Sequence, residues 1–161
     1  MVKVRDAKHL LLTYTSLILI FVGVFTSEWS VTFKIIVLGK LRTTSGLFET
    51  CEESVCGSLK EVYSKEHVPT FLILAGCVAA VACVLTFTAQ FIMWDENNPS
   101  ILMLSTIAFV LSMSGALFIF VGCMIYSYDI FTEYIKPGYS FYVTFCGAMV
   151  LSLGGSLGPK Y

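Results

Sequence analysis

Residues 45–56 read SGLFETCEESVC, and they place two cysteines, Cys51 and Cys56, in a short polar segment. The chain around this segment is apolar, because 57% of the 161 residues are hydrophobic, 13% are charged and the mean hydropathy is +0.82. About a quarter of the residues in a soluble domain are charged. The composition therefore predicts a protein embedded in a lipid bilayer. The net charge of −1 argues against nucleic acid as a partner, since nucleic acid requires a basic face.

Four uncharged stretches predict membrane-spanning helices at residues 10–27, 71–94, 101–126 and 140–158, since none contains Asp, Glu, Lys, Arg or His. A helix needs about 20 apolar residues to cross the hydrocarbon core. Four buried helices of a soluble protein are the alternative, but they would carry polar stripes at the helical period. We therefore expect one membrane domain over residues 1–161. The first stretch ends in FTSEW and not in a small-x-small cleavage site, so we expect it to be retained and not removed as a signal peptide.

Charge predicts the orientation of these spans. Lys3, Arg5 and Lys8 outnumber Asp6 before the first span, which is typical of a cytoplasmic segment. Four spans then put both termini in the cytoplasm, residues 95–100 in a cytoplasmic turn, and residues 28–70 and 127–139 outside the cell. The long loop carries five Lys or Arg residues, which weakens the charge argument, but a close cysteine pair suits an oxidising compartment. We expect a multi-pass protein of the plasma membrane.

The long loop predicts a small antiparallel sheet. Residues 29–38 begin with alternating apolar and polar positions and continue in β-branched residues, which indicates a strand. A turn is expected at residues 39–40, and further short strands over 41–51. A serine with a glutamate three residues later then forms a capping box, so a short helix is expected over residues 59–67.

This order of elements resembles the claudin superfamily, which includes claudins, peripheral myelin and epithelial membrane proteins, the lens fibre intrinsic protein and calcium-channel γ subunits. The resemblance rests on Trp29 after the first span, the turn Gly46-Leu47-Phe48, and Cys51 followed by Cys56. It implies a mainly α membrane fold: a four-transmembrane-helix bundle with a small extracellular antiparallel β-sheet, stapled by a Cys51–Cys56 disulfide. It also implies that the side chains of Trp29, Leu47 and Phe48 form one apolar anchor that seats the sheet on the helices.

Small residues recur at helical spacing inside the expected spans, which lets helix backbones approach closely. They serve either packing within one bundle or contact with a partner's helix, and we favour packing. The four cysteines of the spans are expected to be free thiols. The small residues are Gly76, Ala79, Ala80 and Cys83 in the second span, Ser105, Ala108, Ser112 and Ala116 in the third, and Ala148, Ser152, Gly154, Ser156 and Gly158 in the fourth; the cysteines are Cys77, Cys83, Cys123 and Cys146.

The sequence contains no nucleophile–base set, no phosphate-binding loop, no metal-ligand spacing and no charge within a span, so we expect no enzyme, no cofactor and no metal site. Two functions remain open: cell–cell adhesion or junction organisation through the sheet, which we favour, and service as an auxiliary subunit of a channel or receptor. The partner would be a second copy, a claudin-like protein, or a channel or receptor. The run Ile35, Ile36, Val37 and Leu38 is either a contact edge for that partner or a strand covered by its own sheet.

Overall fold

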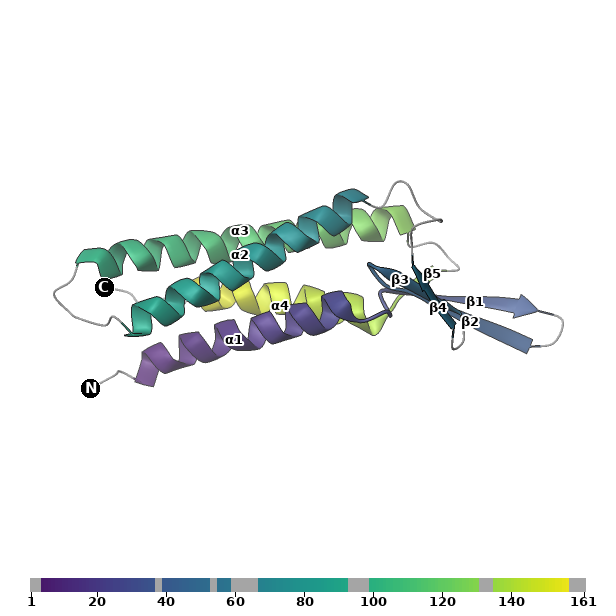
Figure 1. Ribbon diagram of the computed structural model, residues 1–161, viewed down its shortest axis with the longest axis horizontal. Helices are drawn as coiled ribbons and strands as arrows, with labels where there is room; N and C mark the ends of the chain where they lie inside the picture. Colours follow the sequence, from purple (N-terminus) through teal and green to yellow (C-terminus); the bar gives the residue numbers. More distant parts are fainter. Residues whose placement is uncertain are drawn as a thin grey trace.

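The computed structural model describes residues 4–36, 39–52, 55–58, 67–92, 99–130 and 135–156. It is mainly helical, and four helices run side by side with a small sheet at one end (Figure 1). α1 begins and α4 ends at the end away from the sheet (Figure 1). The helices are α1 (Val4–Phe25), α2 (His67–Ile92), α3 (Pro99–Ile130) and α4 (Tyr139–Ser156).

Three of the four helices are long and apolar enough to cross a membrane. The qualifying segments are Lys8–Phe25 in α1, Val68–Ile92 in α2 and Ser100–Tyr128 in α3. The 18 residues of α4 do not qualify, although they contain no charge and pack along α1 and α3. Tyrosine, serine, threonine and glycine lower the hydropathy of α4. Three expected spans are thus confirmed by length and composition, and the fourth stays a prediction.

The helices are longer than the uncharged stretches at several ends. α1 begins at Val4, so it includes the charged Lys8 that was expected in the tail. α2 begins at His67, four residues before the expected start, because Pro69 lies in the first turn, where a missing N–H breaks no helical hydrogen bond. α3 continues to Ile130. Charges and prolines limit how much of a helix lies in lipid, but they do not end the helix there.

Small residues bring neighbouring helices together. A Cβ atom added to Gly76 of α2 would lie 2.8 Å from the carbonyl oxygen of Gly115 in α3, and one added to Gly115 would lie 3.2 Å from Cβ of Ala79. Between α1 and α4, a Cβ atom on Gly147 would lie 3.0 Å from the amide nitrogen of Ile20. These contacts use the small residues inside the bundle, so the packing interpretation is confirmed for Gly76 and Ala79.

Polar contacts also join neighbouring helices. Each links a hydroxyl or thiol of one helix to a polar atom of the next, and such bonds average about 0.6 kcal/mol in membrane proteins. They connect Tyr14 Oη with Thr88 Oγ1 at 3.0 Å (α1–α2), Cys83 Sγ with the Ala108 carbonyl at 3.4 Å (α2–α3), and Ser112 Oγ with the Leu151 carbonyl at 2.6 Å (α3–α4).

The sheet has five antiparallel strands in the order β4-β3-β2-β1-β5. The first four form the expected meander, and the fifth comes from the segment between α3 and α4 and was not expected from the sequence. The strands are β1 (Ser30–Ile36), β2 (Gly39–Ser45), β3 (Glu49–Glu52), β4 (Val55–Ser58) and β5 (Ile135–Pro137).

One detail of the expected sheet was wrong. Gly39 and Lys40 do not form a turn, because they lie in β2 and pair with Ile36 and Ile35 of β1. Gly39 is therefore part of a strand through its pairing with Ile36, although glycine is usually found in turns. The short helix expected over residues 59–67 falls outside the described residues, apart from His67, which begins α2.

Candidate functional site at the joint between sheet and helices

Trp29 connects the sheet to the helices. Its side chain is fully buried, and its Nε1 donates a 2.7 Å hydrogen bond to the carbonyl oxygen of Gly23 in α1. Its backbone N–H donates to the Ser45 carbonyl at the end of β2, and its carbonyl accepts from the N–H of Gly138 after β5, both at 2.9 Å. One residue therefore ties α1, β2 and the β5–α4 connection together.

Two aromatic rings, one from α3 and one from α4, pack against Trp29. The ring of Tyr126 in α3 meets Trp29 edge-on with centroids 5.2 Å apart, and Phe141 of α4 does so at 5.9 Å. Edge-to-face pairs of this kind are favourable beyond the area they bury. The seat for the sheet is thus built by three helices, and the expected anchoring role of Trp29 agrees with its place in the core.

Two glycines allow the backbone segments to meet. A Cβ atom on Gly46 would lie 2.9 Å from Cα of Ser27, and one on Gly138 would overlap the carbonyl oxygen of Glu28. Both obstacles are backbone atoms, which have little freedom to move aside. Gly46 was identified from the sequence, whereas Gly138 was missed; its place directly after Pro137 is the only local signal for it. We call residues 26–29, 45–47 and 138–141 the joint.

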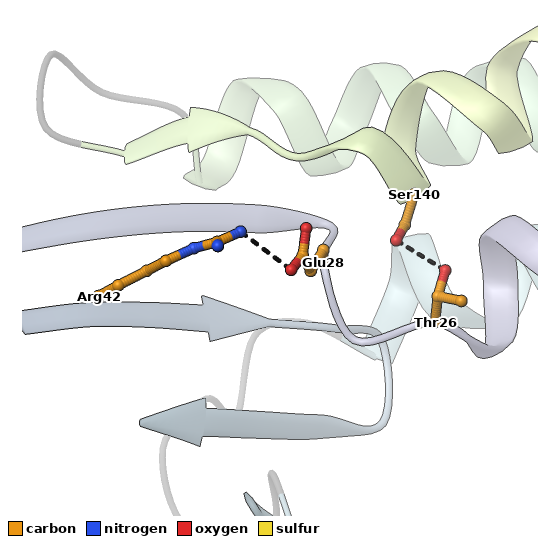
Figure 2. Close-up of polar contacts among 4 residues, drawn as sticks. All are labelled: Thr26, Glu28, Arg42 and Ser140. Carbon is orange, nitrogen blue, oxygen red and sulfur yellow. Dashed lines mark hydrogen bonds and ion pairs between the residues drawn. The ribbon is translucent and has the colours of Figure 1, made fainter. Parts of the chain in front are cut away.

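Polar contacts complete the joint (Figure 2). The hydroxyls of Thr26, just after α1, and Ser140, in the first turn of α4, are hydrogen-bonded at 2.6 Å. Arg42 of β2 reaches the Glu28 carboxylate with Nη2 and Oε1 2.9 Å apart. Ser140 is fully buried, whereas the Arg42 side chain is half exposed, so solvent screens the ion pair.

Leu47 and Phe48 lie in different environments. Leu47 is 8% exposed and belongs to the core with Trp29, but Phe48 is 42% exposed. The ring of Phe48 stacks on Phe25 at the end of α1 with centroids 5.8 Å apart, and Phe25 stacks on Phe21 at 5.7 Å. The expected anchor of three side chains is therefore wrong for Phe48. Leu47 already fills the space inside the joint, which leaves its neighbour on the outer surface.

The cysteines of the loop lie opposite each other. Cys51 of β3 is buried and is the register partner of Cys56 in β4. Register partners in antiparallel strands have Cα atoms about 4.5–5.5 Å apart, within the range that a disulfide requires. The register supports a Cys51–Cys56 bond, which stays a prediction. The cysteines of the spans, Cys77, Cys83, Cys123 and Cys146, are free thiols, as expected.

The expected contact edge lies in a projecting part of the sheet. Ile35 and Ile36 belong to β1, whereas Val37 and Leu38 fall outside the described residues. Among the described residues, β5 pairs with β1 at residues 30–32 and β3 pairs with β2 at residues 43–45, and neither pairs further along. In the part of the chain that the structure describes, residues 33–36 and 39–42 therefore form a two-stranded ribbon that extends beyond the other strands (Figure 1). We call this ribbon the distal hairpin.

Within the described part of the chain, no group of three or more His, Cys, Asp or Glu residues could hold a metal ion. The chemistry of the joint is that of packing and hydrogen bonding between segments. Neither the protein-family models nor the curated proteins compared with this chain match it.

Proposed function

We propose that this chain is a claudin-like, four-span protein of the plasma membrane with both termini in the cytoplasm and the sheet outside the cell. Its function is cell–cell adhesion or the organisation of membrane junctions, by non-enzymatic binding of the sheet to a second copy or a related membrane protein. Many large apolar side chains face outward on the helices, among them Val78, Leu85 and Leu117, and such surfaces suit lipid contact.

One observation carries the choice of a binding function for the sheet. The joint fixes one end of the sheet on the helices through Trp29, while the distal hairpin extends away from it with pairing only between β1 and β2 among the described residues. Open strand edges are the usual place where another chain adds by backbone hydrogen bonds. A rigid base that carries a projecting ribbon is an arrangement suited to contact with another protein.

The experiment removes the distal hairpin and leaves the joint. Residues 34–41 are deleted, and Phe33 is linked to its register partner Arg42 by Asn-Gly, the dipeptide that favours a two-residue hairpin turn. We expect normal surface levels by biotinylation, together with loss of self-association in mild detergent and of adhesion between cells that express the protein. The matched control replaces the same eight residues by a scrambled sequence of equal length, which keeps chain length and composition.

The result distinguishes the two functions. Loss of self-association in the shortened variant, with the unaltered protein copurifying only with itself or claudin-like proteins, supports adhesion. A channel or receptor recovered in stoichiometric amount, by quantitative mass spectrometry of the unaltered protein, would instead favour the auxiliary-subunit function. Unchanged adhesion of cells carrying the shortened variant would remove the proposed role of the distal hairpin.

A further inference from the structure

An aromatic strip runs from the helices onto the sheet along the outer surface of the molecule. It consists of Phe21, Phe25 and Phe48, whose rings stack in that order at 5.7 and 5.8 Å. All three are exposed, with Phe25 at 63%. Phe21 and Phe25 belong to α1, but Phe48 comes from the turn before β3 and meets them across a separation of more than twenty residues in sequence. The sheet thus continues an apolar surface of the helix.

A groove of about 280 Å³ lies beside this strip. It is lined by Phe25, Thr26, Gly46, Leu47 and Phe48. None of these side chains carries a charge, and the hydroxyl of Thr26 is already hydrogen-bonded to Ser140 at 2.6 Å and to the Val22 carbonyl at 2.7 Å. The volume is slightly below the 300–1,000 Å³ that is typical of pockets for drug-sized ligands. The groove therefore suits a slender apolar group.

The position of the groove identifies that group. The membrane-crossing segment of α1 ends at Phe25, which is itself a wall of the groove. The outer face of the same helix exposes Leu11, Ile18 and Val22 below Phe25, so the groove continues the lipid-contacting face of α1. At the end of a span, the neighbouring lipid presents the part of its acyl chain closest to the glycerol. A bilayer lipid is thus present at this depth without any further partner.

We propose that the groove at the foot of the sheet binds the upper part of one phospholipid acyl chain, with Phe25 and Phe48 as its two walls. The binding site is formed jointly by α1 and the turn before β3. An acyl chain held there ties the sheet to the bilayer as well as to the helices. The proposal stands independently of the adhesion function, because it concerns contact with lipid and not with a partner protein.

The test uses the full chain in phosphatidylcholine nanodiscs that contain a photoactivatable phosphatidylcholine with a diazirine near the glycerol end of one acyl chain. Labelled peptides are mapped by mass spectrometry, with labelling around Met124, which is exposed near the sheet end of the α3 span, as the internal reference; Phe109, exposed in the middle of that span, is the site of the control substitution. We expect labelling at residues 45–48. In Phe48→Ala this labelling should fall about tenfold, because the acyl chain loses its contact with one wall of the groove, which is worth roughly half of the transfer free energy of a phenylalanine side chain. Phe25→Ala should reduce it similarly, and Phe109→Ala should leave it unchanged.

Each outcome decides the proposal. Reduced labelling in both wall variants, with melting temperatures close to that of the unaltered protein, supports it. If Phe48→Ala disturbs folding, Phe25→Ala on the exposed helix face carries the decision. Labelling at residues 45–48 that does not depend on either wall overturns the proposal. So does labelling by a photoactivatable sterol but not by the phospholipid, or protection of the groove by a second copy or a copurified protein.

Discussion

The two ends of the sheet are built in opposite ways. At the joint, Trp29 is fully buried, its backbone and indole make three hydrogen bonds, and backbone segments approach so closely that only glycine fits at position 138. In the distal hairpin, residues 33–36 and 39–42 pair only with each other among the described residues. The same strand, β1, therefore begins at the joint and ends in the distal hairpin.

This difference assigns the joint a structural role and is the basis for the binding role that we propose for the distal hairpin. Changes in the joint should affect folding and trafficking, because a few hydrogen bonds and close contacts there hold α1, β2 and the β5–α4 connection together. Changes in the distal hairpin should leave folding intact and alter binding. Substitutions in the two regions test this separation.

The largest effect is expected for Gly138→Ala. The new methyl group would overlap the carbonyl oxygen of Glu28. Because position 138 connects β5 directly to α4, this overlap can be removed only by moving β5 or the start of α4. We expect a loss of roughly 4 kcal/mol or more in the free energy of unfolding, seen as absence from the cell surface in biotinylation. Gly154→Ala is the matched control, since its methyl group would meet Thr13 Oγ1 at an ordinary 3.7 Å. Equal surface levels for both variants would show that the joint is not tightly packed.

A slightly smaller effect is expected for Trp29→Ala. Truncation of a large buried aromatic side chain costs about 3–5 kcal/mol, and the cavity would lie between Tyr126 and Phe141. The variant should be retained inside the cell. Trp29→Phe should recover part of the surface level, because it restores ring contacts but not the bond to the Gly23 carbonyl. Normal surface levels of Trp29→Ala would contradict the separation of roles.

The sequence was most informative where a residue's role depends on local chemistry. Charge-free stretches located all four helices, because a helix in lipid excludes charged residues over a long run. Alternation located β1, because successive side chains of a strand point to opposite faces of the sheet. Trp29 and Gly46 were recognised from a motif, and both lie in the joint.

Roles that depend on distant segments could not be predicted. β5 is only three residues long, too short to show a period, and it exists because β1 offers an edge at residues 30–32. Gly138 is needed because Glu28 passes beside it, which no local pattern reveals. Phe48 is exposed because Leu47 occupies the inner position. The motif alone does not indicate which of two adjacent apolar residues is buried.

A moderate effect is expected from the cysteine pair of β3 and β4. If Cys51 and Cys56 are bonded, thiol labelling of the unfolded, unreduced protein should modify Cys77, Cys83, Cys123 and Cys146 but spare the pair. Cys51→Ser should then lower stability by about 2 kcal/mol, the chain-entropy value for so short a loop. Surface levels should fall less than for Trp29→Ala, because the pair holds one edge of the sheet and not the joint. Modification of Cys51 without reductant would disprove the bond.

The smallest effect is expected at the border between the two regions, where Arg42 of the distal hairpin meets Glu28 of the joint at 2.9 Å. Arg42 is half exposed, so the ion pair competes with water and should contribute at most about 1 kcal/mol, and less at high salt. Melting temperatures of Arg42→Ala, Glu28→Ala and the double variant, measured at low and high ionic strength, give the coupling energy. A coupling that is small and falls with salt means that the distal hairpin is attached to the joint mainly through its strands and remains free to bind a partner. A coupling of about 2 kcal/mol or more that persists in high salt would mean that Arg42 belongs to the joint. In that case the rigid region would extend at least to the Phe33–Arg42 pair, and the binding surface that we propose would shrink to the part of the hairpin beyond it.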